Sequence, residues 1–509
     1  MKRRIILLTI ISVLITFTVR AEVNDPIQNI RNYRQANEQK IVKEFMDLLA
    51  IPNVASDSAN IRKNADFIVE MLKRRGVEAR LLEFKDTPPA VYGQLKSSTA
   101  AKTIGIYVHY DGQPVDVSQW KSEPWKPVLR EGTVDSKNID LDSVTGPLNP
   151  EWRLYARSTG DDKAPISAIT AALDAMKSTG MSPSVNVKFF FEGEEEAGSA
   201  HLPGLMEQYK DLLKADVWLL CDGPVHQSRK QQLFFGARGV MGVEMIVYGP
   251  TRALHSGHYG NWAPNPIALL ANLLASMRDM EGKILIPRFY DSVRPLTDSE
   301  RKAISEVPAP DEQMRGELGL AKTEDNNATL VERVVSIPAL NIRGFQGGNV
   351  GEKAANAIPI EAKASIDFRL VPDEKPAKVR ELTEQHIKNQ GFHIVYEPPT
   401  PEIRKQFAKI IYLQWDDGYP AARTSMDLPE SQAVIHAIEK PLGIQLIKMP
   451  SLGGSIPMYL FVDVLNAPVI GLPIANHDNN QHAANESLRL QNLWDGIEIY
   501  AALFTSLQL

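Results

Sequence analysis

Val-Asn-Val-Lys-Phe-Phe-Phe-Glu-Gly-Glu-Glu-Glu-Ala-Gly-Ser, residues 185–199, joins an apolar run to a dense cluster of carboxylates. The run Val185 to Phe191 predicts a strand, and Gly198-Ser199 predicts the turn that follows it. Four glutamates stand at the end of this strand with no Lys or Arg among them. Taken alone, such a cluster is more typical of a solvated acidic loop. A bound cation is the alternative, and other segments of the chain bear on that choice.

Composition limits what kind of metal site and partner the chain can have. The chain has 509 residues, of which 43% are hydrophobic and 23% charged, which predicts a soluble globular protein of two to four domains. The net charge of -6 gives no electrostatic case for a nucleic-acid partner. Cys221 is the only cysteine, which excludes an intramolecular disulfide and a cysteine-based zinc cluster. A metal would therefore be held by His, Asp and Glu.

The N-terminus has the pattern of a signal peptide. Met1-Lys2-Arg3-Arg4 is basic, Ile5 to Val19 is apolar, and Val19-Arg20-Ala21 offers small residues at the positions that a signal peptidase reads. We expect residues 1–21 to be removed, which leaves a periplasmic or secreted protein without stable membrane association. A retained anchor is the alternative, although the run is short for a span of about 20 residues.

The order of apolar and amphipathic segments predicts an α/β fold in two domains. Strands and helices alternate in residues 22–228, which predicts a catalytic domain with a mostly parallel sheet flanked by helices. Residues 229–398 read as strand, helix, two strands, helix and strand, the layout of a ferredoxin-like α+β domain. Residues 282–328 within it form a polar insertion of unexplained role. Residues 399–509 are expected to complete the first sheet.

Other potential metal ligands also follow predicted strands or precede helices. His109 and Asp111 follow the strand 103–108 and lie on the same side of an extended chain, so Asp111 can fix the imidazole of His109. Asp161 and Asp162 precede a helix, where an N-cap is the simpler interpretation for Asp162. Asp222 ends the strand 217–220.

Two histidines, His477 and His482, lie in a polar loop before the last helix, and His477 is the less suitable ligand. Together these segments place His, Asp and Glu side chains at the edge of an α/β sheet, where open sheets locate their sites. Two Zn²⁺ ions would be balanced by Asp161, Glu196, Asp222 and a hydroxide, with two neutral imidazoles. That balance is typical of a two-metal hydrolase.

The order of these motifs resembles a known metallo-hydrolase family. This family contains carnosine-type dipeptidases, carboxypeptidase G, acetylornithine deacetylase and succinyl-diaminopimelate desuccinylase. The resemblance runs from about residue 40 to the C-terminus. It rests on His109 with Asp111, Asp161-Asp162-Lys163, Glu195-Glu196, and His482-Ala483-Ala484-Asn485-Glu486. The dipeptidase branch looks most similar.

The resemblance implies a role for each of these residues. Two divalent metal ions per subunit are expected, preferably Zn²⁺, with Mn²⁺ or Co²⁺ as alternatives. Asp161 would bridge the metals, His109 and Asp222 would hold one, and Glu196 and His482 would hold the other. Glu195 would be the general base, with Glu194 as the alternative register, and Asp111 would steady His109. The peptide bond after Asp161 is typically cis in this family.

The second domain would serve as a lid and a dimerisation domain. His255 resembles the lid histidine that reaches the partner subunit's site in dimeric members, so a homodimer is expected. Asn356, Arg369, Gly454 and Ser455 resemble substrate-binding positions. The simpler interpretations are a turn at Gly453-Gly454 and a surface ion pair for Arg369.

These observations predict an exported di-zinc metallopeptidase that hydrolyses dipeptides or the C-terminal amide bond of short peptides. An N-acyl amino acid deacylase of the same family is the alternative, because it needs the same metal site. A binding protein without turnover would be expected to lack the base or a ligand, and Glu195 and the ligand residues are all present. The two-domain layout also predicts open and closed states.

Overall fold

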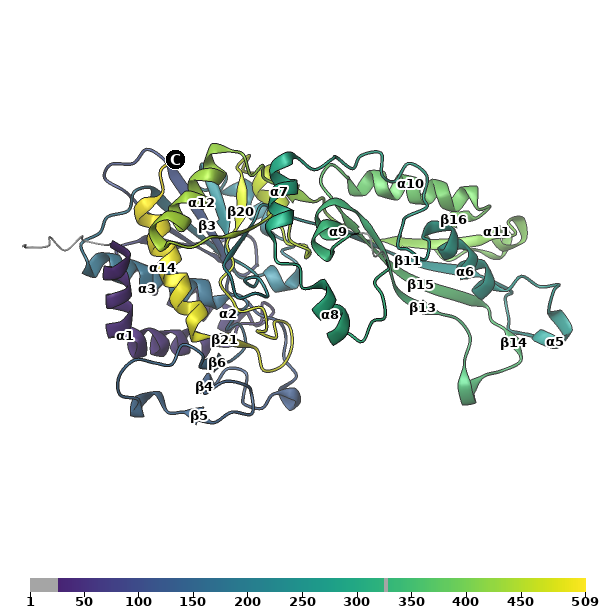
Figure 1. Ribbon diagram of the computed structural model, residues 1–509. Helices are drawn as coiled ribbons and strands as arrows, with labels where there is room; N and C mark the ends of the chain where they lie inside the picture. Colours follow the sequence, from purple (N-terminus) through teal and green to yellow (C-terminus); the bar gives the residue numbers. More distant parts are fainter. Residues whose placement is uncertain (1–25, 325–327) are drawn as a thin grey trace, which may run out of the picture.

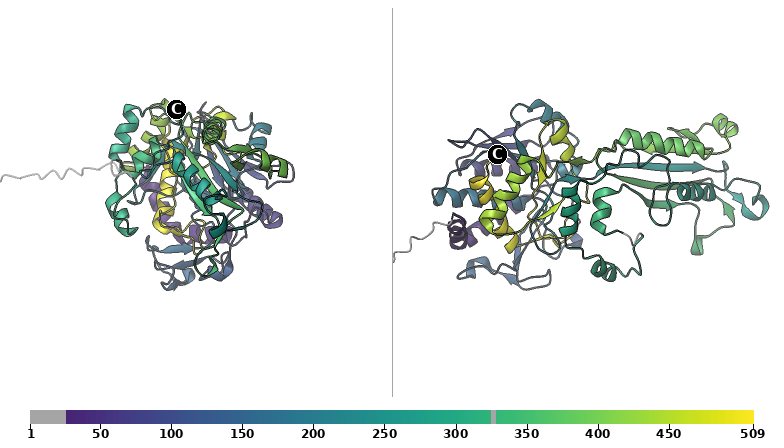
Figure 2. Two further views of the ribbon diagram at one scale, coloured as in Figure 1. Left: turned by 90° about the vertical axis from the view of Figure 1, so that its right-hand side faces the viewer. Right: turned by 45° about the horizontal axis from the view of Figure 1, so that its top comes forward.

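The computed structural model describes residues 26–324 and 328–509, so the predicted signal peptide lies outside the described residues. The chain folds into a rounded part and an elongated part that projects from one side of it (Figures 1 and 2). Among the described helices, none combines the length and apolarity needed to cross a membrane.

The rounded part is built on an eight-stranded sheet. Its order is β1 (Glu78–Leu82), β2 (Ala90–Leu95), β7 (Asn186–Glu192), β3 (Thr103–His109), β8 (Val217–Leu220), β20 (Val469–Gly471), β9 (Gln232–Phe234) and β19 (Ile447–Met449). The strands β7, β3, β8 and β20 are parallel, whereas β1, β2 and β9 pair antiparallel to their inner neighbours. The predicted α/β fold with a mostly parallel sheet is confirmed.

Helices cover both faces of this sheet, which explains why its central strands are apolar throughout. One face packs against α1 (Pro26–Leu49), α2 (Ser58–Lys73), α3 (Lys163–Ser178), α12 (Pro429–Leu442) and α14 (Leu490–Ser506). The other face holds an aromatic core under α4 (Leu202–Gln208) and α13 (Met458–Asp463). Trp218 in that core occupies the space beside Gly105, where a Cβ would lie 2.2 Å from the indole. A smaller sheet joins β21 (Ser487–Arg489), β6 (Arg153–Tyr155), β4 (Val128–Arg130) and β5 (Asn138–Ile139).

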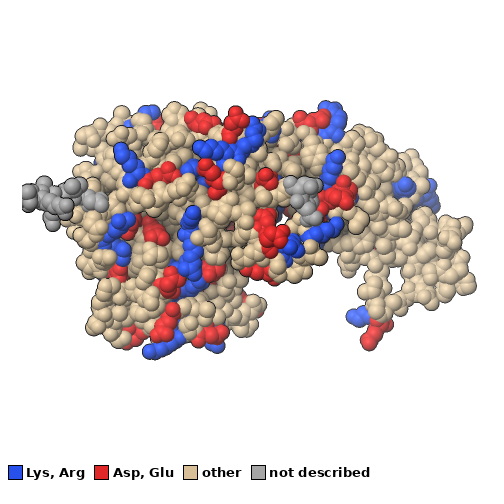
Figure 3. All heavy atoms as spheres, in the orientation of Figure 1, with Lys and Arg blue, Asp and Glu red and all other residues tan. Residues whose placement is uncertain are grey.

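The elongated part is a separate, largely antiparallel sheet with helices packed on one core. The strand order is β13 (Ala339–Gln346), β15 (Glu361–Leu370), β11 (Gly239–Tyr248), β17 (Ile410–Trp415) and β16 (His393–Val395). Helices α6 (Pro266–Met277) and α10 (Pro376–Asn389) contribute to its core. In Figure 3 the visible far end of this part carries few charged side chains, whereas acidic and basic groups are interspersed over the rounded part.

One prediction about this sheet is wrong. Residues after 398 were expected to return to the first sheet, but β17 pairs with β11 and β16 in the second. β17 takes the place that a ferredoxin-like layout gives to its fourth strand, and β16 lies outside it at the edge. The proline-rich segment 398–401 forms a turn that leads into the short helix α11 (Pro401–Gln406). The chain does not leave the domain there.

Two antiparallel segments cross between the two parts. β10 (Gly236–Ala237) pairs with β18 (Ala422–Arg423), and Val240 exchanges two backbone hydrogen bonds with Tyr419. The polar insertion forms α7 (Asp298–Glu306) and α8 (Asp311–Glu317), and α9 (Leu330–Ser336) follows it. Ile284 and Phe289 enter the core of the elongated part, whereas Ala303 enters the core of the rounded part. The insertion therefore straps the two parts together.

Candidate active site

The predicted ligand residues gather at the carboxyl ends of β3, β7 and β8. His109 ends β3, Glu195 and Glu196 follow β7, and Asp222 lies two residues after β8. Parallel strands end at the same edge of a sheet, so neighbouring strands bring these side chains together. Asp161 arrives from the loop before α3, and His482 from the loop before β21.

Asp161 lies at the centre of the cluster, between two imidazoles. Its Oδ1 is 2.9 Å from His109 Nε2, and its Oδ2 is 3.1 Å from His482 Nε2. The same His482 nitrogen is 3.2 Å from Glu196 Oε2. The Asp161–Asp162 peptide bond is cis, as the resemblance implied.

Two sets of ligand atoms are compact enough to hold a metal ion. His109, Asp161 and Glu196 form one set, and His109, Asp162 and Asp222 form the other, each within 4.8 Å. Asp162 in the second set was interpreted from sequence as a helix N-cap. It does occupy the N-cap position of α3, but its side chain makes no capping hydrogen bond, and its Oδ1 has no partner.

The electrostatics of the cluster fit divalent cations. Burial raises the pKa of Asp222 to about 7, and the nearby charge of Asp161 adds to the rise. Hydrogen bonds to Asp161 and Glu196 raise the pKa of His482 to about 10. In this arrangement protons must neutralise carboxylates that lie too close together. A divalent metal would do the same through the oxygen and imidazole ligands that zinc accepts.

Asp111 holds the segment that carries the glutamates. Its two oxygens accept hydrogen bonds from the backbone N–H groups of Glu195 and Glu196, both at 3.0 Å. Its Oδ1 also lies 3.4 Å from Nδ1 of His109, as expected of a carboxylate that fixes the orientation of this imidazole. Glu194 instead turns to His201, 2.9 Å from its Nδ1. The geometry thus favours the register with Glu195 and Glu196 over the alternative with Glu194.

Glu486 ends the His482 motif but had no role predicted for it. The buried Glu486 carboxylate accepts from the backbone N–H groups of Ser158, Gly160 and Asp161 at 2.8–2.9 Å. It also pairs with Arg157 at 2.9 Å. Glu486 therefore fixes the loop that presents Asp161. The spacing of four residues from His482 was the available signal.

The substrate-binding positions divide into two groups. Arg369 Nη1 donates to Ser455 Oγ at 2.9 Å, and its Nε pairs with Asp367 at 2.8 Å. Arg369 is thus more than a surface ion pair, because it joins the lid to the loop that carries Gly454. His255 and Asn356 do not reach the cluster of their own chain. His255 is in β12 (Leu254–His255), and Asn356 directly precedes β14 (Ala357–Ile358). Both lie at the far end of the elongated part, the predicted lid (Figure 1).

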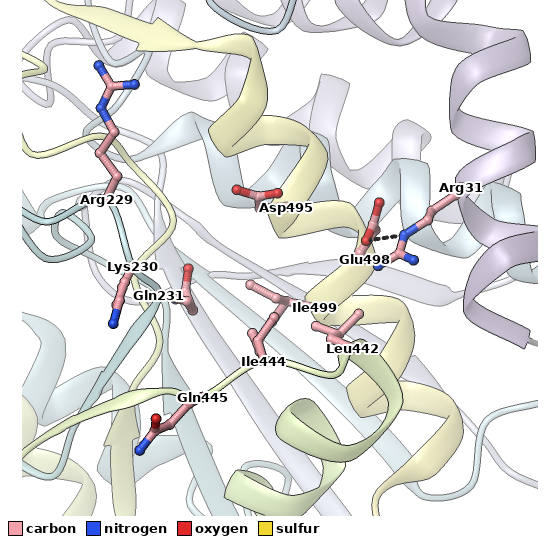
Figure 4. Close-up of a pocket in the computed structure, with 10 residues that line it drawn as sticks. All are labelled: Arg31, Arg229, Lys230, Gln231, Leu442, Ile444, Gln445, Asp495, Glu498 and Ile499. Carbon is pink, nitrogen blue, oxygen red and sulfur yellow. Dashed lines mark hydrogen bonds and ion pairs between the residues drawn. The ribbon is translucent and has the colours of Figure 1, made fainter.

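A cavity of about 410 Å³ lies elsewhere, between α1, α14 and the segment after α12 (Figure 4). Asp495, Lys230 and the Arg31–Glu498 ion pair line it. None of the cluster residues contributes to this cavity, so it is not part of the candidate active site.

Comparison with known families identifies the family of the chain. Residues 105–506 match Peptidase family M20/M25/M40. The chain belongs to this family. It is accordingly a metal-dependent hydrolase of peptide bonds, and the predicted family membership is confirmed.

Among curated members of the family, the chain is 27% identical to the Cys-Gly metallodipeptidase DUG1 of Candida albicans, over 92% of this chain and 95% of that protein. It is also 27% identical to the human Beta-Ala-His dipeptidase, over 82% and 77% of the two chains.

Solved structures of family members agree with this assignment. The structure resembles the M20 family metallo-carboxypeptidase Sso-CP2 from Sulfolobus solfataricus, with a TM-score of 0.74, 28% identity and coverage of 92% and 98%. Human carnosine dipeptidase 1 shares the fold, with a TM-score of 0.70, 23% identity and coverage of 94% and 98%.

Proposed function

We propose that this protein is an exported dipeptidase with two divalent metal ions per subunit, preferably Zn²⁺. The observation that carries the proposal is the buried cluster of two imidazoles and several carboxylates with Glu195 beside it. Curated relatives that act on Cys-Gly and Beta-Ala-His by name support a dipeptide as the substrate class.

The proposed ligands divide between two metals, with Asp161 between them. We propose that His109 and Asp222 hold one metal, that Glu196 and His482 hold the other, and that Asp161 is shared. Asp162, which lies with His109 and Asp222, is an additional candidate for the first set. When bound, the metals polarise the amide carbonyl and make the attacking water more acidic.

Glu195 is placed to move the proton. Its backbone N–H donates to Asp111, and its carboxyl group forms no ion pair with any of the described residues. Burial raises the pKa of Glu195 well above its ordinary value, and the charges of Asp222 and Glu192 add to the rise. Bound metals would offset part of this rise. Glu195 would take a proton from the attacking water and deliver it to the leaving amine.

The terminal carboxylate of the substrate would bind beyond Glu195. Arg369 and Ser455 already form one hydrogen-bonded pair, and the backbone N–H groups of the loop at Gly454 lie beside them. In a dipeptide the scissile bond and the terminal carboxylate are only one residue apart, so a dipeptide would engage the metals and this pair together. It also suits an N-acyl amino acid, so a deacylase of the same family stays the alternative.

We further propose a homodimer in which His255 and Asn356 act on the partner subunit's substrate. Their position at the far end of the lid leaves them without a role in their own subunit. That end also exposes apolar side chains, with Trp262 78% and Phe345 46% exposed, as an interface would. Export rests on residues 1–21 alone, and N-terminal sequencing of the protein purified from its own cells tests it: a mature chain starting at Glu22 is expected, and a start at Met1 would contradict it.

Hydrolysis by the metal-loaded protein tests the function. We expect Cys-Gly or Beta-Ala-His to be cleaved, activity to be lost on chelation, and Zn²⁺ or Mn²⁺ to restore it. The Glu195→Gln variant should lose at least about 10³-fold in kcat while binding metal normally. Cleavage of N-acyl amino acids but not of dipeptides would favour the deacylase. Activity that survives Glu195→Gln would contradict the assignment of the base.

A further inference from the structure

Tyr419 lies on one of the two segments that cross between the domains, and its backbone is held firmly there. Its N–H donates to the Val240 carbonyl at 2.8 Å, and its carbonyl accepts from the Val240 N–H at 3.0 Å. The preceding Gly418 has a φ of +57°, and a Cβ at that residue would lie 2.5 Å from Met241 Cβ. The backbone at Tyr419 therefore has one position relative to the lid strand β11.

The aromatic ring of Tyr419 is fixed from the other domain. It stacks on Tyr459, with ring centroids 5.2 Å apart and an interplanar angle of 13°. Tyr459 lies in the first turn of α13, directly after the loop that carries Gly454 and Ser455. The Tyr419 ring is thus held between the crossing segment that carries it and the helix that follows the substrate loop.

Val240 of β11 pairs with Arg369 on one side and with Tyr419 on the other, so the side chains of Arg369 and Tyr419 project from the same face of the sheet. Burial raises the pKa of Tyr419 to about 12, and the charge of Glu195 adds to the rise, while Arg369 and a hydrogen bond with Ser455 lower it. The phenolic hydroxyl therefore keeps its proton at neutral pH, where a peptide carboxylate is ionised. The phenol ring also stacks beside the helix that directly follows the loop of Ser455.

Several of the neighbouring donors are already engaged in hydrogen bonds. Arg369 directs Nη1 to Ser455 and Nε to Asp367, and Arg238 directs Nη2 to the backbone carbonyls of Ile337 and Arg369. A carboxylate entering this pocket needs several donors for its two oxygens. A neutral phenol adds one donor without bringing a further charge next to Arg238 and Arg369.

We propose that Tyr419 contacts the substrate, and that its phenolic O–H donates a hydrogen bond to the terminal carboxylate held by Arg369 and Ser455. This inference rests on the proposed dipeptidase function. It makes the domain crossing itself part of the substrate pocket, because the backbone of Tyr419 pairs with lid strand β11 while its side chain binds substrate. Specificity for a free carboxylate then depends on a residue that no metal-ligand motif contains.

Steady-state kinetics on a dipeptide and on its C-terminal amide test the proposal. For metal-loaded Tyr419→Phe we expect KM for the dipeptide to rise about tenfold to hundredfold, with kcat within about twofold of wild type. The amide lacks the carboxylate, so the substitution should change its hydrolysis by less than about twofold. Tyr459→Phe keeps the stacked ring and loses the other hydroxyl, and it serves as the matched control with little expected change.

Calorimetry with the dipeptide provides a second readout that needs no turnover. Glu195→Gln should bind the dipeptide about tenfold to hundredfold more tightly than the Glu195→Gln, Tyr419→Phe double variant. Equal KM values, equal loss on dipeptide and amide, or a loss confined to kcat would overturn the role of Tyr419 while leaving the proposed function intact. A wild-type protein that neither binds nor cleaves dipeptides would overturn the proposed function and this inference with it.

Discussion

At the scale of single residues, a few buried carboxylates organise the site. Asp111 holds the backbone of Glu195 and Glu196, and Glu486 holds the backbone of Asp161. Buried charges are tolerated only when hydrogen bonds or opposite charges satisfy them. Each of these groups therefore stabilises one geometry of the ligand loops.

Glu486→Gln should weaken the site without removing any ligand. The amide keeps the size of the side chain but loses the charge, and it cannot accept at both oxygens from three N–H groups and Arg157. We expect metal affinity to fall about 10- to 100-fold, with kcat/KM falling alongside it. Titration with Zn²⁺ in a competing chelator measures this. Glu498→Gln, in an ion pair with Arg31 away from the metal cluster, is the control, and equal metal affinity in the two variants would contradict the role of Glu486.

Glu374 provides a pH-dependent prediction. Burial raises its pKa to about 7 from an ordinary 4.5, although Arg238 opposes the rise. A carboxyl group with a raised pKa in the folded state binds more protons than in the unfolded state, so its contribution to stability is lost as the pH rises from about 4.5 through 7. Glu374→Gln should therefore be about 1–3 kcal/mol more stable relative to wild type at pH 8 than at pH 5.

Thermal unfolding of wild type and Glu374→Gln at both pH values measures this difference. The control is Glu381→Gln on the exposed side of α10, which should show no pH-dependent change relative to wild type. A Glu374→Gln variant whose advantage is the same at pH 5 and pH 8 would contradict the prediction.

At the scale of elements, the insertion and α9 support the substrate loop. Glu300 in α7 forms a buried ion pair with Arg423 on crossing strand β18, at 3.3 Å. Arg423 donates to the carbonyl of Val335 in α9. Helix α9 also lies against the substrate loop, because a Cβ at Gly453 would be only 3.3 Å from the side chain of Val334. The insertion thus connects the domain crossing to the loop that binds substrate.

Glu300→Ala should loosen this connection. Removing one partner leaves the Arg423 guanidinium buried and unpaired, which typically costs about 3–5 kcal/mol. We expect faster hydrogen exchange in α9 and in residues 453–457, and a higher KM with the metal site unchanged. Glu306→Ala at the exposed end of α7 is the control. Exchange that rises only within α7 would show that the insertion does not support the loop.

At the scale of the whole molecule, the lid end and the metal cluster of one chain are separated along the length of the lid (Figure 1). This separation is the reason that the proposed role of His255 is at the partner subunit's site. The proposed dimer makes each active site a product of two chains, as an isologous interface allows.

Mixing two inactive variants tests this arrangement. Glu195→Gln and His255→Ala homodimers should each be nearly inactive. A mixed dimer holds one site with both residues intact, so refolding or coexpressing equal amounts should restore about a quarter of the wild-type activity. Mixing two preparations of the same variant is the control. No recovery in verified mixed dimers would contradict a role for His255 across the interface.

The sequence by itself determined the fold class and the ligand residue types. Apolar runs such as 185–191 have to be strands that are buried on both faces of a sheet. The carboxylates and histidines that follow such strands are then placed at the edge of that sheet. Motif spacing also favoured Glu195 and Glu196, rather than Glu194, as the glutamates of the site.

The tertiary structure alone decided three features. The pairing of β17 with β11 could not be predicted because a short apolar strand fits either sheet, and only long-range pairing selects one. The roles of Glu486 and Asp162 depend on which backbone N–H groups and side chains come within a few ångströms, and spacing along the chain does not encode these distances. Tyr419 enters the pocket because two distant segments, the domain crossing and α13, enclose its ring.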